Sequence, residues 1–110
     1  MTSKQFIPAN EGWEDLGGGV SRQIMGWDIQ LMMVKVRFEK QAVGAPHAHP
    51  HTQSTYCIDG VFEFTIDGVK TVIKKGEGLY IAPNQQHGTT CLEAGTLLDV
   101  FSPYREDFLK

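Results

Sequence analysis

Apolar and polar residues alternate along much of this chain with the two-residue period of β-strands. The clearest case runs from residue 32 to residue 39, where Met32, Val34, Val36 and Phe38 alternate with Met33, Lys35, Arg37 and Glu39. Such alternation predicts a strand with one buried face. Shorter runs predict further strands at about 21–27, 54–58, 62–66, 69–74, 79–82, 87–93 and 96–101. Eight or so short strands at nearly regular spacing predict an all-β, antiparallel sandwich or barrel.

Glycine-containing pairs mark the predicted turns. Asp59-Gly60 and Asp67-Gly68 both lie between apolar runs. We expect a hairpin at each, because glycine accepts the positive φ that a type I′ turn requires. Ala94-Gly95 is expected to join the last two strands.

Both ends of the chain lie outside the predicted strands. Gly17-Gly18-Gly19 is expected to form a loop, and the segment before it, with Phe6 and Trp13, could cap a barrel or reach across a dimer. At the other end, Ser102 and Pro103 predict the N-cap and the first residue of a short C-terminal helix over 104–109.

Length and composition narrow the classes of protein to consider. A chain of 110 residues with 41% hydrophobic residues predicts one domain, residues 1–110, with one core. No apolar run reaches membrane-spanning length and the first residues lack the order of a signal peptide, so we expect a cytoplasmic protein without a membrane partner. A net charge of -3, without a cluster of Lys or Arg, argues against a nucleic-acid partner. Cys57 and Cys91 have no CxxC spacing and are expected to be reduced core residues.

All four histidines fall into two places that suggest a metal site. His47, His49 and His51 are crowded together just before Gln53, and His87 follows some thirty positions later. Imidazole is the commonest side-chain metal ligand, so this spacing predicts a metal centre. Pro50 interrupts the alternation, so we do not expect a flat row of side chains. His51 is left open between a ligand, a supporting residue and a loop histidine.

Asp99 is the second candidate for chemistry, because it lies on the last predicted strand with apolar neighbours on both faces. An aspartate in that setting is costly unless it is paired or functional. One alternative is a structural Asp99 held by the backbone or by Arg105. Arg105 itself is either a clamp for a substrate carboxylate or a helix residue pairing with Glu106 or Asp107.

The histidine pattern resembles the cupin superfamily. His47, His49, Gln53 and Gly60 match its first motif from the first histidine onward, with Gln53 at the usual glutamate position and Gly44 too close for the leading glycine. Gly76 and His87 match the second motif loosely, with Ala82, Asn84 and Cys91 at its usual Pro, Gly and Asn positions. The resemblance implies a small jelly-roll β-barrel, whereas the function stays open because cupins serve many functions.

Longer stretches resemble one family of pectin-degradation cupins, the KdgF family, over almost the whole chain. They are WEDLGGGVSRQI, LMMVKVRFEK, HAHPHTQ and DVFSPYREDFL. The resemblance implies an enzyme that opens cyclic 4,5-unsaturated uronate monomers, released by pectin or alginate lyases, to linear 5-keto-4-deoxyuronate. It implies metal ligation by His47, His49, Gln53 and His87, catalytic roles for Asp99, Phe101 and Arg105, and substrate binding by Phe101 and Arg105.

Gln53 in place of glutamate changes the charge of the expected site. Three neutral imidazoles and an amide leave a divalent ion its full charge, which favours an anionic, bidentate substrate such as a carboxylate with a neighbouring oxygen. We expect one divalent transition metal per chain, Ni, Fe, Zn, Mn or Co, because nitrogen-rich ligand sets suit such metals better than Mg or Ca.

Two other functions remain open from the sequence. One is a different small-cupin metalloenzyme, such as a dioxygenase or a sugar isomerase, and the other is a non-catalytic sugar-binding cupin. Because exposed edge strands favour pairing between copies, we expect a homodimer.

Overall fold

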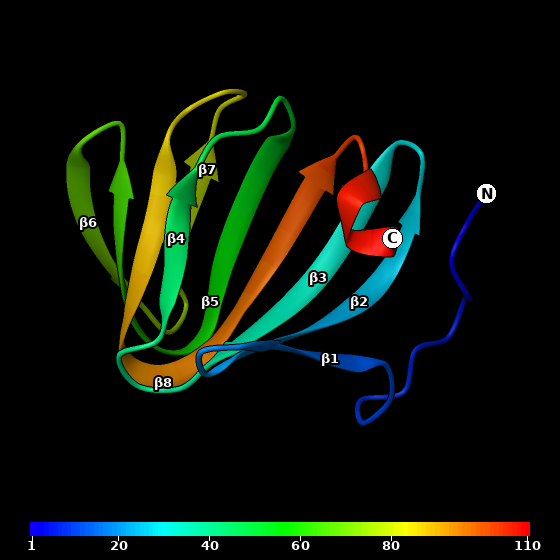
Figure 1. Cartoon of the computed structure of the whole chain (residues 1–110), viewed down its shortest axis with the longest axis horizontal. Coiled ribbons are helices and arrows are strands. Elements are labelled where there is room, and N and C mark those ends of the chain that lie inside the picture. Colours follow the sequence, from blue (N-terminus) through cyan, green and yellow to red (C-terminus); the bar gives the residue numbers. More distant parts are fainter.

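The computed structural model describes all residues from 1 to 110 and contains eight antiparallel strands and one 3₁₀ helix (Figure 1). The all-β prediction is confirmed. The elements are β1 (Trp13–Gly17), β2 (Val20–Asp28), β3 (Leu31–Phe38), β4 (Val43–His47), β5 (Thr52–Ile66), β6 (Val69–Lys74), β7 (Gly78–Ile81), β8 (His87–Ser102) and η1 (Glu106–Leu109).

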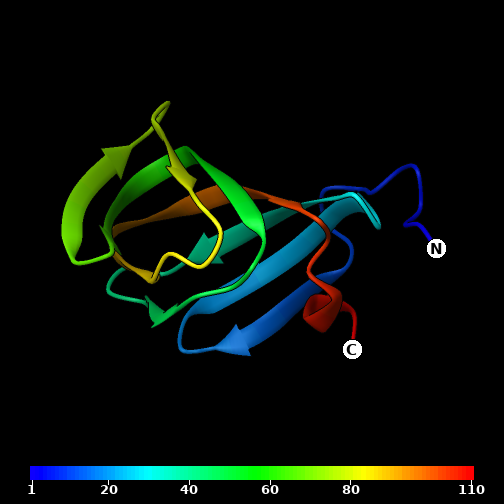
Figure 2. The ribbon, with the colours of Figure 1, turned by 90° about the horizontal axis from the view of Figure 1, so that it is seen from above.

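One sheet with the order β1-β2-β3-β8-β5-β6 carries the whole fold, with β4 added to β8 and β7 added to β5. The two long strands, β5 and β8, pair from Thr52 opposite Ser102 to Ile66 opposite His87. At the Thr52–Ser102 end β8 also pairs with β3 and β5 also pairs with β7. At the Ile66–His87 end β8 pairs with β4 and β5 pairs with β6. Seen from above, the sheet therefore rolls around an interior (Figure 2).

The expected turns at Asp59-Gly60 and Ala94-Gly95 are wrong, because each pair lies inside a continuous strand. Gly60 has φ +84°, and the pairing of β5 with β8 shifts register around it. The two backbones approach so closely here that a Cβ on Gly95 would lie 2.6 Å from the Gly60 Cα. Both strands bend together instead of turning back. The Asp67-Gly68 prediction is confirmed, since these residues join β5 to β6 with φ of 47° and 82°.

Both ends of the chain differ from the expectation. Trp13 belongs to β1, a strand that the sequence did not predict, and Phe6 is exposed. The expected helix over 104–109 shortens to η1, because Ser102 is still paired in β8 and its hydroxyl donates to Gln30 O instead of capping a helix. β4 was also missed; it is short and its side chains are mostly exposed.

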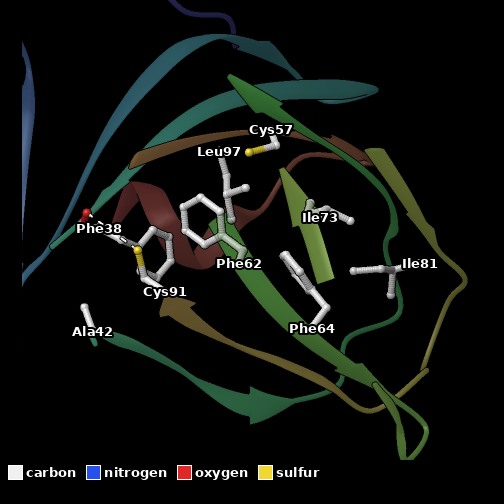
Figure 3. Packing of buried hydrophobic residues seen from close by; sticks show 9 residues of the cluster. All are labelled: Phe38, Ala42, Cys57, Phe62, Phe64, Ile73, Ile81, Cys91 and Leu97. Atoms are coloured by element: carbon white, nitrogen blue, oxygen red, sulfur yellow. Dashed lines mark hydrogen bonds between the residues drawn. The ribbon is translucent and has the colours of Figure 1, made fainter. Parts of the chain in front are cut away.

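The main hydrophobic core fills the part of the roll enclosed by β5 to β8. Its side chains point toward one another in Figure 3 and come from Phe38, Ala42, Cys57, Phe62, Phe64, Ile73, Ile81, Cys91 and Leu97. Both cysteines are free and buried, as predicted. Removing a core phenylalanine typically costs about 3–5 kcal/mol, so this core is a firm support for the strands that carry the site. No helix of the chain has the length and apolar character needed to cross a membrane.

Candidate metal centre

Three histidines meet where β4 ends and β8 begins. His47 is the last residue of β4 and pairs with His87, the first residue of β8. His49 comes from the loop between β4 and β5, which also holds Pro50. The possible ligand nitrogens of His47, His49 and His87 all lie within 4.8 Å of one another. Strand pairing thus brings together residues that are forty positions apart.

The hydrogen bonds of His47 and His87 leave one nitrogen of each ring free for a ligand. The Nδ1 atoms lie 2.9 Å from Ala45 O and Gln85 O respectively, and because a carbonyl only accepts, each Nδ1 carries the proton. The Nε2 atoms are then unprotonated acceptors, and Nε2 of His87 is buried without any hydrogen-bond partner. Histidines that bind metals commonly donate their other N–H in this way.

Gln53 completes the group through its side-chain oxygen. Its Oε1 lies 2.9 Å from His49 Nε2, while its Nε2 donates to Thr55 Oγ1 at 3.0 Å. Two ligands at right angles around an ion, each at about 2.1 Å, would be about 3.0 Å apart. The distance between Gln53 Oε1 and His49 Nε2 is therefore also the distance expected between two neighbouring ligands of one metal ion. These residues fit a divalent transition metal.

Burial keeps His49 and His87 in the neutral form that a metal requires. It lowers the pKa of His49 from 6.5 to about 4, although the hydrogen bond with Gln53 opposes the shift. It also lowers the pKa of His87, against the effect of the Gln85 carbonyl. Both rings are accordingly uncharged at neutral pH.

Asp99 is connected to Gln53 through Thr55. Thr55 and Asp99 are direct cross-strand neighbours, and the Thr55 hydroxyl donates to Asp99 Oδ1 at 2.7 Å. Burial raises the pKa of Asp99 from 3.8 to about 6, more than the hydrogen bond from Thr55 and the charge of Arg105 lower it. A carboxyl group with this pKa exchanges a proton readily near neutral pH.

Arg105 does not form an ion pair with Asp99. Its Nε and Nη2 donate to the two carboxylate oxygens of Asp107 at 3.1 Å and 3.0 Å, and this hydrogen bonding lowers the pKa of Asp107. The Arg105 guanidinium carbon is 5.2 Å from the ring centroid of Phe101 and 4.4 Å from that of Phe108. Arg105 thus pairs with its neighbour Asp107, which was one of the two alternatives for this residue. Its remaining terminal nitrogen, Nη1, has no hydrogen bond with the protein.

One cavity brings the chemical groups together. Its lining includes six of the seven residues singled out from the sequence: His47, Gln53, His87, Asp99, Phe101 and Arg105. The seventh, His49, reaches the same group through its contact with Gln53. The cavity wall is otherwise largely apolar, which strengthens electrostatic interactions inside it.

Several residues around the site were missed or left open by the sequence analysis. His51 is outside the histidine group, and its Nε2 donates to Tyr104 O at 3.0 Å, which ties the loop between β4 and β5 to the segment that carries Arg105. Tyr104 in turn stacks on Trp27 with 5.3 Å between ring centroids. The sequence carried a weak signal for Thr55, which shares one strand face with Gln53. It carried none for Arg22 and Phe108, which also line the cavity.

Comparison with known proteins agrees with the fold and the histidine group. Residues 34–101 match the family model described as a cupin domain. The chain is 44% identical over 108 residues to the pectin degradation protein KdgF of Dickeya dadantii (strain 3937), covering 96% of this chain and 98% of that protein. The chain is therefore a cupin.

Solved structures agree with this assignment. An RmlC-like cupin from Shewanella frigidimarina NCIMB 400 superposes with a TM-score of 0.94 at 42% identity, covering 97% of each chain. KdgF from Halomonas sp. superposes with a TM-score of 0.90 at 35% identity, covering 97% of this chain and 99% of that chain. Within the cupins, the chain belongs to the KdgF family.

Proposed function

We propose that this chain is a metal-dependent enzyme of pectin degradation that converts cyclic 4,5-unsaturated uronate monomers to linear 5-keto-4-deoxyuronate. The observation that carries the proposal is the buried carboxyl group of Asp99 in the same cavity as the three-histidine group and Arg105. The similarity of sequence and structure to KdgF proteins over nearly the whole chain supports this proposal.

The ligand set proposed for one divalent ion per chain is His47, His49, Gln53 and His87. None of these side chains carries a negative charge, so a divalent ion bound by them would keep its full positive charge. That charge would attract an anionic substrate. A bound divalent ion would orient the sugar and stabilise negative charge that develops on its oxygen atoms. Ni, Fe, Zn, Mn and Co all fit this ligand set.

The proposed reaction is an isomerisation in which all atoms of the substrate are kept. The hydroxyl group at C1 loses its proton, the bond between C1 and the ring oxygen breaks, and C1 becomes an aldehyde. The former ring oxygen stays on C5 as an enolate, and C4 takes up a proton to give the 5-keto product. Asp99 is the group that carries the proton, because its raised pKa suits both release and uptake near neutral pH. Such acid–base help is typically worth about 10²–10⁴ in rate.

Phe101 and Arg105 are proposed to hold the sugar beside Asp99. Phe101 is the cross-strand neighbour of Gln53, and its ring centroid lies 5.8 Å from that of His49 and 5.2 Å from the Arg105 guanidinium carbon. Arg105 would bind the carboxylate with its free Nη1, and by exchanging Asp107 for substrate it could offer a second nitrogen.

The test is loss of ultraviolet absorbance when the metal-loaded protein is incubated with unsaturated galacturonate. We expect decay well above the enzyme-free rate, with the ketone product identified by NMR. Glu93→Gln is a suitable control variant, because Glu93 is exposed and its side chain makes no ion pair. A wild-type rate equal to the enzyme-free rate would contradict the proposed function.

We also propose that residues 1–110 act as one cupin domain in a cytoplasmic homodimer. The free, buried Cys57 and Cys91 suit a reducing compartment. Tyr56 and Tyr80 are 48% and 62% exposed on the outer surface of β5 and β7, where a second copy could cover them. Analytical ultracentrifugation should give twice the monomer mass of 12.3 kDa, and a monomer at micromolar concentration would contradict the dimer.

A further inference from the structure

Arg22 enters the cavity from β2, a strand that carries none of the three histidines. In the paired strands it stands opposite Val36, and Val36 stands opposite the core residue Leu97, so all three side chains share the inner face of the sheet. Arg22 lines the same cavity as Asp99 and Arg105. Its side chain is only 14% exposed.

Two arginines meet at one aromatic ring of the C-terminal segment. The guanidinium carbon of Arg22 lies 4.0 Å from the ring centroid of Phe108, and that of Arg105 lies 4.4 Å from the same centroid. Phe108 belongs to η1, which Figure 1 shows beside β2 and β3. The two cations are therefore close enough for one sugar-sized anion to reach both.

The hydrogen bonds of the two arginines leave Arg22 with more capacity for a ligand. Arg22 uses Nε alone, which donates to Glu14 Oε1 at 3.0 Å, and both of its terminal nitrogens are without a protein partner. Arg105 already uses two nitrogens on Asp107. A carboxylate can accept hydrogen bonds from both terminal nitrogens of such a guanidinium group at once, which is the strong, two-pronged form of this interaction.

We propose that Arg22 binds the substrate carboxylate through its two terminal nitrogens, with Arg105 on the other side of the same group. This inference rests on the proposed function and adds a residue that selects acidic sugars over neutral ones. Glu14 holds the Arg22 side chain in place through Nε, which is the nitrogen that the substrate does not need.

The competing explanation is structural: Arg22 would serve only its ion pair with Glu14 and its packing on Phe108. The chain offers a matched control for that explanation. Arg37 on β3 lies 4.0 Å from the ring centroid of Trp13, yet it is exposed, stands opposite Ser21 and is outside the cavity.

The experiment measures KM and kcat of the metal-loaded full chain on unsaturated galacturonate and on its methyl ester, which lacks the charge. Arg22→Met should raise KM for the acid by about tenfold or more, as expected for losing hydrogen bonds to a charged group, and should leave kcat within a few-fold. On the ester, Arg22→Met and wild type should have similar KM values. Arg37→Met should match wild type on both substrates.

The outcomes separate this inference from the proposed function. A wild-type chain without turnover contradicts the proposed function itself. An active wild type whose KM for the acid is unchanged by Arg22→Met overturns the role of Arg22 alone, and so does an equal loss on acid and ester. If Arg22→Met fails to fold, Arg22→Lys decides the question. The inference predicts that Arg22→Lys, which keeps the charge but loses the paired geometry, raises KM for the acid and not for the ester, whereas a structural role predicts equal effects on the two substrates.

Discussion

The variant Asp99→Asn tests two properties of this carboxyl group: the effect of its burial on the free energy of unfolding, and its role in catalysis. Burial raises the pKa of Asp99 from 3.8 to about 6. One pKa unit corresponds to about 1.36 kcal/mol, so ionised Asp99 disfavours the folded state by about 3 kcal/mol relative to the neutral acid. Asparagine has the same shape, and its oxygen can accept the hydrogen bond from Thr55, so we expect the variant to keep the fold.

The sign of the pH dependence follows from the raised pKa. The folded state binds the Asp99 proton more tightly than the unfolded state does. This contribution to stability is fully present below pH 3.8 and is lost as the pH rises through about 6. Asparagine does not ionise, so the unfolding free energy of wild type minus that of the variant should fall by up to about 3 kcal/mol between about pH 4 and about pH 7. The subtraction cancels His49, whose lowered pKa of about 4 acts in the opposite direction.

Urea unfolding of the metal-free proteins at several pH values measures this difference, with Glu93→Gln as the control. In the metal-loaded state, Asp99→Asn should bind as much metal as wild type and lose turnover by on the order of 10²-fold or more. A stability difference that does not vary with pH would refute the burial argument. Near-normal turnover in the variant would refute the proton-transfer role.

Three further predictions concern the metal ligands and Arg105. The double variant His47→Ala, His49→Ala should lose the near-stoichiometric metal found by elemental analysis of the untagged wild type; unchanged metal content would rule out the proposed ligands. Gln53→Glu should retain metal but bind the anionic substrate more weakly, because the added carboxylate cancels one positive charge, and equal or tighter binding in titration calorimetry would contradict the charge argument. Arg105→Lys should mainly raise KM, since lysine keeps the charge but loses the forked geometry. Asp107→Asn, which removes only the ion pair, is its control, and a drop in melting temperature with normal kinetics in both variants would indicate a structural role.

Local patterns were enough to predict most of the strands and the candidate ligands. Alternation depends only on neighbours along the chain, so the strand over Met32 to Phe38 could be inferred from the sequence. The positive φ values at Asp67-Gly68 are likewise a local requirement, and the hairpin there follows from them. The spacing of His47, His49 and Gln53 was a recognisable motif of the family.

Tertiary structure alone decided how these segments face one another. Asp59-Gly60 has the same local signal as Asp67-Gly68, but it becomes a bend because Gly95, thirty-five residues later, lets the second backbone approach. The partners of Thr55, His51 and Arg22 also lie on distant segments, so no local pattern could identify them. Strand pairing and side-chain packing are interactions between segments far apart in the chain, whereas alternation and turn chemistry act within a few residues. That is why the sequence determined most of the strands and the ligand motif, and only the folded chain determined the hydrogen bond from Thr55 to Asp99 and the second arginine of the cavity.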